Sequence, residues 1–449
     1  MLCLLQLACA ASPTPTQDAR EHVREQVLID LDPGGLIWTG LDVDDDLALL
    51  IGIALNRSSS IELIGLTTCG GNAPIKHAAP GLDLLLRTAG IGASDLPAGI
   101  GRGHGWQSMH VPWPNMRRLS ALSPDEPSSD EAAELIISAA HASGPHGLTI
   151  VTLGPPTNLA AALAKAPEIA PKLRRVLLMG GQLDKGGRMC LNFMSDRAAA
   201  RAVLASPVPT TIVPIQTCAQ ASFTAAHVSR LEAKCCGGKK PAAVCALLTK
   251  MTLQTRVMPW LVNQHVTRRK RVASAQRPPP SKSLESGFIP WDVVAILAAF
   301  HPRLFDGWEL HRVSVPTCAG AEPCNGTMIV DPNALSPAET MRLAGQDREA
   351  HRNVALIPYV LVSEEALLDT AIDLLCAVPA AGEFADARPP YLLGFLKEAA
   401  VLGLLVVAVV LTAVKRCVDA RRGARTKAEL ARSSRVEGLR PKRRPIKRD

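Results

Sequence analysis

The sequence lacks several patterns that identify common classes of protein. Its 449 residues contain no pair of CxxC motifs with the spacing of a zinc site, and no internal repeat. A net basic charge is also missing outside one segment. The net charge is +8, but residues 415–449 carry 14 Lys and Arg against 4 Asp and Glu, so the rest of the chain carries 8 − 10 = −2. A main body without basic excess excludes a general nucleic-acid binder, and we expect no nucleic-acid partner.

The first residues resemble a secretory signal peptide. MLCLLQLACAAS is a short apolar run that ends in small residues, with the cleavage-like tripeptide Ala8-Cys9-Ala10, although no basic residue precedes it. We assign residues 1–11 to this signal. The alternative interpretation is a disordered or wrongly assigned start of the chain.

One segment near the other end is apolar enough to be a membrane span. Residues 391–414 include the run 399–414, which is 16 residues without charge, or about 24 Å of helix. A buried core helix is the alternative, but the basic residues that follow favour a span with a cytoplasmic tail at 415–449. We therefore expect a single-pass protein anchored in the lipid bilayer, with its main body extracellular or luminal.

The twelve cysteines are consistent with an oxidising compartment. Cys318 and Cys324 bracket AGAEP and are the best candidates for a disulfide. The possible partners of Cys235 and Cys236 are Cys245 and Cys218.

The region 25–380 alternates β-branched runs with Ala- and Leu-rich runs. The strand-like runs are VLIDLD, IELIGLTT, LTIVTLG, RRVLLMGG and TTIVPIQT, and helix-like runs include DLALLIGIAL, DEAAELIISAAHA and TNLAAALAKA. This order predicts an α/β domain with an open, mostly parallel, Rossmann-like sheet and helices on both faces. Ligands of such sheets bind beyond the carboxyl ends of the strands.

Six aspartates lie in the stretch LIDLDPGGLIWTGLDVDDDLALL. Asp30 and Asp32 alternate at the carboxyl end of a strand and point the same way, while Asp44, Asp45 and Asp46 begin a helix. Helix capping would explain one or two of the three helical aspartates but not the strand-end pair. Because so many oxygen ligands suit a hard cation, the stretch predicts a Ca2+ or Mg2+ site.

At this point the sequence resembles the nucleoside hydrolases (nucleoside N-ribohydrolases). DLDPG and DDDLALL match the two halves of the family pattern D-x-D-P-G-x-D-D-A-L-A-L-L, with GLIWTGLDV inserted between them. Aligning DDDLALL on DDALALL selects Asp44 and Asp45 and places Asp46 at the alanine. Further matches follow in the family's order: IGLTTCGGNAP, IVTLGPPTNLAAAL, VLLMGG, LNFMSDRAAA and GFIPWDVVAIL.

The resemblance implies a hydrolase that splits ribonucleosides into ribose and free base. The residues that match the family's Ca2+ ligands are Asp32, Asp45, Asp292 and, through its backbone carbonyl, Leu153. Those that match its substrate-binding residues are Asp44, Asn72 and Asn192. Asp32 would also take a proton from the attacking water, and the sugar would pass through an oxocarbenium-like state.

Two positions depart from the family pattern. Trp291 stands where the family usually has a histidine, and it can stack on a base but cannot donate a proton. Cys190 stands in place of a glutamate that contacts the sugar. His104, in GRGHGW, is the remaining candidate for the catalytic acid, although a lone loop histidine is more often unimportant.

Two other functions remain open on the sequence. DLDPGG also resembles the D-x-D motif of haloacid-dehalogenase-like phosphatases, but no later paired-aspartate motif is present. The other hypothesis is a membrane-anchored protein that binds a ribosyl ligand and has lost turnover through Trp291 and Cys190. The four retained aspartates, Asp32, Asp44, Asp45 and Asp292, argue against it. The base preference is open, as is a homo-oligomeric assembly.

Overall fold

The computed structural model describes residues 24–34, 42–92, 94–102, 129–183, 190–238, 240–257, 287–317, 326–331, 335–345 and 347–381. All of them belong to the first of two compact units, Met1–Ala385, and none to the second, Asp386–Asp449. The predicted signal peptide, His104, the Cys318–Cys324 pair and the predicted span at 391–414 lie outside the described residues. Among the helices that are described, none is both long and apolar enough to cross a membrane. Membrane anchorage therefore stays a prediction from sequence.

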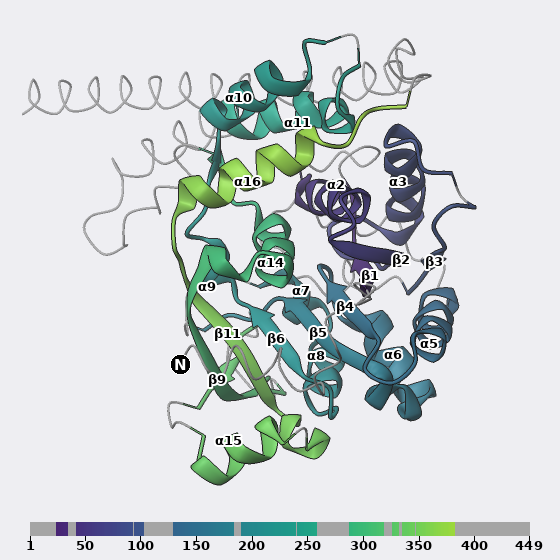
Figure 1. Ribbon diagram of the computed structural model, residues 1–449, viewed down its shortest axis with the longest axis vertical. Coiled ribbons are helices and arrows are strands. Elements are labelled where there is room, and N and C mark those ends of the chain that lie inside the picture. Colours follow the sequence, from purple (N-terminus) through teal and green to yellow (C-terminus); the bar gives the residue numbers. More distant parts are fainter. Residues whose placement is uncertain are drawn as a thin grey trace, which may run out of the picture. The chain divides into compact units, whose positions relative to one another are not determined.

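Nine strands within the described ranges form one mixed sheet (Figure 1). Its order is β10-β9-β11-β6-β5-β4-β1-β2-β3. In chain order the strands are β1 (Glu25–Leu31), β2 (Ile61–Thr68), β3 (Ala98–Ile100), β4 (Leu148–Thr152), β5 (Leu173–Met179), β6 (Thr210–Val213), β9 (Phe305–Ser314), β10 (Ile329–Val330) and β11 (Val354–Leu361). Only β9 runs against its neighbours, β11 and β10, and the other pairs are parallel. The predicted open, mostly parallel sheet is confirmed.

The main helices form two groups that flank this sheet (Figure 1). In the first group α2 (Asp44–Arg57), α14 (Trp291–Phe300) and α16 (Glu364–Cys376) pack against one another. The second group consists of α5 (Glu131–Ser143), α6 (Thr157–Lys165) and α8 (Arg197–Leu204). The other α-helices within the described ranges are α3 (Ile75–Thr88), α7 (Leu191–Ser195), α9 (Ile215–Cys218), α10 (Ala225–Cys235), α11 (Leu248–Thr252) and α15 (Pro337–Ala344). A two-stranded sheet pairs β7 (Phe223–Thr224) with β8 (Gly287–Phe288), and short 3-10 segments include η2 (Ala243–Leu247).

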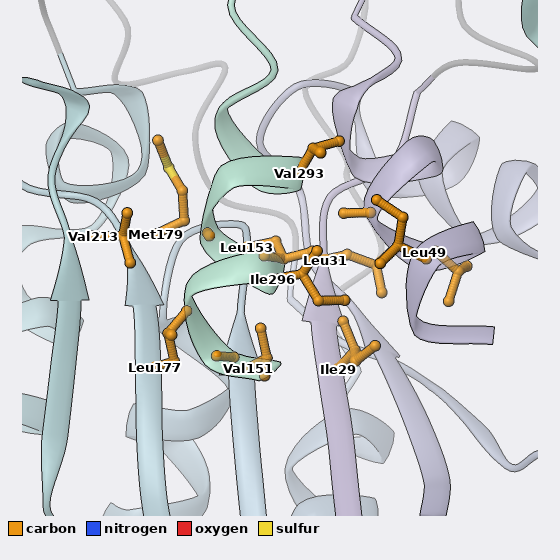
Figure 2. Close-up of a cluster of buried hydrophobic side chains, with 14 of the residues drawn as sticks. Ile29, Leu31, Leu49, Val151, Leu153, Leu177, Met179, Val213, Val293 and Ile296 are labelled. Carbon is orange, nitrogen blue, oxygen red and sulfur yellow. The ribbon is translucent and has the colours of Figure 1, made fainter. Parts of the chain in front are cut away.

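Part of the core lies between the sheet and the helices α2 and α14. The sequence of α14, WDVVAILAAF, is apolar on every side, and its residues from Asp292 to Ala299 are all buried. A helix of this kind is stable only when it is surrounded by other elements. Figure 2 shows Val293 and Ile296 of α14 beside Leu49 and above the strand residues Ile29 and Val151. This packing fixes the first turn of α14 over the ends of the central strands.

The direction of the connections changes between β4 and β1. From β1 the chain moves to β2 and β3 on one side, and then returns to β4, β5 and β6 on the other. Such a switch point leaves an open crevice beyond the carboxyl ends of the two strands, where ligands bind in open α/β sheets. The residues that follow β1 and β4, Asp32 and Leu153, are two of the predicted metal ligands.

Two disulfides join α10 to its neighbours. Cys236 pairs with Cys245 of η2, as the sequence allowed, but Cys235 pairs with Cys376 at the end of α16. The alternative partner, Cys218, is a buried free thiol. The Cys235–Cys376 pair was missed because it depends on the packing of α10 against α16, which sequence spacing does not show.

The long-range disulfide should contribute more stability than the short one. Cys235 and Cys376 are separated by 141 residues, and Cys236 and Cys245 by 9. Because a crosslink that closes a longer loop removes more entropy from the unfolded chain, we expect Cys376→Ser to cost about 2–5 kcal/mol. Cys245→Ser is the matched control with the smaller loss. Urea unfolding of both variants measures the difference, and equal losses would contradict the entropic explanation.

Candidate metal centre

Buried aspartates from three elements converge beyond the carboxyl end of β1. Asp32 follows that strand, Asp44 and Asp45 lie in the first turn of α2, and Asp292 lies in the first turn of α14. The four side chains are at most 3% exposed. Carboxylate oxygens of Asp44, Asp45 and Asp292 lie within 4.8 Å of one another. Two helix N-termini therefore face the cluster, and their dipoles favour its negative charge.

Asp32 joins this cluster through Asp45 and Asn72. Its backbone N–H donates to Asp45 Oδ1 at 3.1 Å, and its own Oδ2 accepts from the backbone N–H of Asn72 at 2.6 Å. The side-chain amide of Asn72 donates to Asp45 Oδ2 at 2.9 Å. Gly71 permits this close approach, because a Cβ there would lie 1.7 Å from Asp32 Oδ2. Asn72, predicted on the substrate side, thus orients two of the predicted metal ligands.

The three helical aspartates differ in their contacts. Carboxylate oxygens of Asp44 and Asp45 lie close to those of Asp292, and the assignment of Asp44 and Asp45 to substrate and metal stays a prediction. Asp46 is buried but does not belong to this group of carboxylates.

The carboxylates of the cluster strongly affect one another. Burial raises the pKa of Asp32, Asp44 and Asp292 well above the usual range, and neighbouring carboxylates raise it further. Burial also raises the pKa of Asp45 to about 7, although hydrogen bonds from Asp32, Asn72 and Asp292 oppose that rise. The main causes of these shifts are burial, the neighbouring carboxylates and hydrogen bonds. Like charges in this arrangement require protons or a cation to balance them.

The donor set fits a hard divalent cation. All of the candidate donors are oxygens, which Ca2+ and Mg2+ prefer. Asp32 Oδ1 is buried and accepts no hydrogen bond from the described residues, so one oxygen of the strand-end carboxylate is available to a cation.

The carbonyl of Leu153 and the side chain of Asn192 lie together at the ends of β4 and β5. The amide of Asn192 donates to the carbonyl oxygens of Leu153 and Met179, the latter at 3.0 Å. Asn192 was predicted to bind ribose, and in this arrangement it also joins the two strand ends. Leu153 is 1% exposed, and its N–H donates to the Asp30 carbonyl at 2.7 Å, which places it beside β1.

A comparison with known families agrees with this geometry. The sequence model of one protein family, the inosine-uridine preferring nucleoside hydrolases, matches residues 27–357 of this chain. The chain belongs to this family. The match includes every described residue of the aspartate cluster and the sheet from β1 into β11.

Individual relatives are more distant. A stretch of 223 residues is 30% identical to an uncharacterized protein of Schizosaccharomyces pombe and covers 46% of this chain and 66% of that protein. Uridine nucleosidase 1 of Arabidopsis thaliana is 28% identical over 212 residues, 44% of this chain and 58% of its own. The chain thus spans less than two thirds of these relatives. A solved plant nucleoside hydrolase has the same fold, with a TM-score of 0.54 and 19% identity over 79% of this chain and 99% of its own.

The two departures from the nucleoside hydrolase pattern both lie at the start of a helix. Trp291 is the first residue of α14, next to Asp292, and is partly buried. Its carbonyl accepts from the Cys218 thiol at 3.5 Å. Cys190 is buried, and its sulfur accepts from the Gly181 N–H at 3.0 Å. A thiol held in this way is a packed side chain and does not replace a carboxylate that contacts sugar.

Sequence reasoning missed two residues that bind Asp30, next to the aspartate cluster. Asn158, at the start of α6, and Thr67, near the end of β2, both donate to the carboxylate of Asp30. The available signal was the segment GPPTNLA, which places a polar residue at the start of a helix directly after a strand end. Its contact with Asp30 is not visible in the sequence, because it joins segments far apart in the chain.

Proposed function

We propose that this protein hydrolyses the N-glycosidic bond of ribonucleosides with a bound Ca2+ ion. The observation that carries the proposal is the convergence of Asp32, Asp44, Asp45 and Asp292, all buried, at the switch point of a nucleoside hydrolase fold. Asp32, Asp45, Asp292 and the Leu153 carbonyl would hold the ion. When bound, Ca2+ supplies a positive charge that orients the ribose diol and favours deprotonation of a water molecule.

The side chains of the cluster have separate roles in this proposal. Asp32 acts as the general base and takes the proton from the water. Asn72 keeps one oxygen of that carboxylate fixed. Asp44 and Asn192 bind ribose hydroxyls. Water then attacks the anomeric carbon, and the base leaves with the electrons of the broken bond.

The alternative functions receive less support. The family match over residues 27–357 favours a nucleoside hydrolase over a phosphatase. A ribosyl-ligand binder without turnover would retain the same carboxylates. A measurement of activity therefore decides between a hydrolase and a binder. The test is a reducing-sugar assay of the purified protein with uridine, cytidine, inosine and guanosine, with and without chelator. Ribose release that is lost with chelator and restored by Ca2+ is the expected result, and no release from any nucleoside would refute the proposal.

Trp291 should limit the departure of natural bases. A purine or pyrimidine leaves faster when a side chain protonates it, and a missing acid costs about 10²–10⁴-fold. We therefore expect a p-nitrophenyl riboside, whose leaving group needs no proton, to be cleaved much faster than nucleosides. Trp291→His should raise kcat/KM for nucleosides and leave the nitrophenyl substrate almost unchanged.

Two variants control this prediction. Trp291→Phe keeps a stacking face without a proton and should not accelerate nucleosides. His104→Ala, which removes the candidate acid predicted from sequence, should slow nucleosides and spare the nitrophenyl riboside. If wild-type protein cleaved both substrate classes equally well, another residue would already protonate the leaving base, and Trp291 would not limit its departure.

A further inference from the structure

A network of buried hydrogen bonds adjoins the metal centre. It is formed by residues that were not assigned to metal or substrate. Its central residue is Asn158, which is 1% exposed at the start of α6. Its amide nitrogen donates to Asp30 Oδ1 at 2.8 Å and to the Thr68 carbonyl at 3.0 Å. Its amide oxygen accepts from the Arg102 N–H at 3.4 Å. One side chain therefore contacts the end of β1, the end of β2 and the segment after β3.

Each of these contacts leads to a residue of the centre. Asp30 lies two positions before Asp32 in the same strand end, and its carbonyl accepts from Leu153 N–H at 2.7 Å. Its carboxylate has a second donor, the Thr67 hydroxyl, at 2.7 Å. The contact of Asn158 with Asp30 therefore fixes the segment that presents both Asp32 and the Leu153 carbonyl.

The second contact leads to Asn72. The Thr68 carbonyl accepts from the Gly101 N–H at 2.9 Å as well as from Asn158, and the Gly70 N–H donates to the Arg102 carbonyl at 3.1 Å. The turn that begins at Thr68 is thus held against the segment after β3. It ends at Asn72, which binds the carboxylates of Asp32 and Asp45.

The side chain of Asn158 is closely packed. A Cβ at Gly101 would lie 2.1 Å from the Asn158 side-chain oxygen, so only glycine fits there without displacing the amide. Both nitrogen and oxygen of the amide have partners at the same time. An aliphatic residue would leave the Thr68 carbonyl and the Asp30 carboxylate short of a donor, and an aspartate would place a second carboxylate against Asp30.

We propose that Asn158 is a positioning residue for the metal centre, which it serves by fixing the strand ends that present Asp32, Leu153 and Asn72. The inference rests on the proposed function, because it assumes that these residues hold a Ca2+ ion. Side chains that orient metal ligands from behind typically affect metal affinity by about 10–100-fold when they are removed. Asn158 itself touches neither metal nor substrate.

The test compares Asn158→Ala with Asn56→Ala in the purified full-length protein. Asn56 is a matched control: it is also a helical asparagine, and its side chain accepts from the Leu63 N–H at 3.0 Å near the opposite end of β2. Both variants lose a contact between a helix and β2, so both should lower the thermal midpoint. Calorimetric titration with Ca2+ alone and the kcat and KM for uridine and inosine are then measured well below those midpoints.

We expect Asn158→Ala to weaken Ca2+ binding by about 10–100-fold and to lower kcat, while Asn56→Ala binds Ca2+ as wild type does. Gly101→Ala, which displaces the Asn158 amide without removing it, should change Ca2+ affinity in the same direction and serves if Asn158→Ala does not fold. Unchanged Ca2+ affinity in a folded Asn158 or Gly101 variant, or an equal loss in Asn56→Ala, would overturn the inference. Wild-type protein that bound no Ca2+ would refute the metal proposal itself, and this inference with it.

Discussion

Replacing Asp292 by alanine is expected to abolish nucleoside hydrolysis and, at the same time, to stabilise the metal-free protein. The carboxylate is buried against Asp44 and Asp45, so its removal relieves repulsion and a desolvation cost. It also removes one of the few protein ligands of the proposed Ca2+, and we expect kcat/KM to fall by at least about 10³-fold. An ordinary destabilising core substitution would lower activity and stability together.

The measurement pairs kcat/KM in saturating Ca2+ with the thermal midpoint in chelator. Asp292→Asn, which keeps the size of the side chain, should behave in the same way. Asp306→Ala is the control, because that aspartate is exposed on β9 and should affect neither quantity. Near-normal activity of Asp292→Ala would show that the match of WDVVAIL to the family's metal-binding segment is wrong.

Chelated protein should become less stable as the pH rises from about 4 to about 7, which is the reverse of ordinary acid denaturation. Aspartates of the unfolded chain titrate near 3.8, whereas burial raises the pKa of Asp45 to about 7 and that of Asp32, Asp44 and Asp292 well above 3.8. Between these values the folded protein binds more protons than the unfolded chain. The free energy of unfolding therefore falls with rising pH.

Ca2+ should reverse this dependence. The ion competes with protons for the same oxygens, so the stabilisation it provides grows as the carboxylates ionise. Thermal midpoints at pH 4.5 and pH 7.5, with chelator and with excess Ca2+, measure both effects, and we expect the midpoint of chelated protein to drop by about 5 °C or more. A midpoint that rose with pH in chelator would contradict the arrangement of unbalanced carboxylates described above.

The part of the site that was predictable from sequence is the part encoded locally. Asp30 and Asp32 alternate within one strand, and Asp44 and Asp45 open the next helix, so simple periodicity brings them to one edge of the sheet. Asp292 lies in a different part of the chain, and only the resemblance to a family identified it. The alternation of strand-like and helix-like runs was likewise enough to predict the parallel sheet.

The contacts that could not be predicted are those between distant elements. Nothing in the spacing of Cys235 and Cys376 indicates that α10 and α16 lie side by side. Asn72 was assigned to substrate, yet its amide and its backbone bind the carboxylates of Asp45 and Asp32. These roles depend on the final distance between side chains, and residue type and position alone do not determine that distance.

The position of α14 in the chain has a consequence for the order of folding. This helix follows β6 and is enclosed by α2 and α16, the last helix of the described chain, so Asp292 reaches Asp32 only when the sheet and its covering helices are almost complete. A cation can therefore find its full set of ligands only late in folding. Ca2+ would then slow unfolding far more than it speeds refolding. It would increase the kinetic stability of a chain that has already reached its native topology.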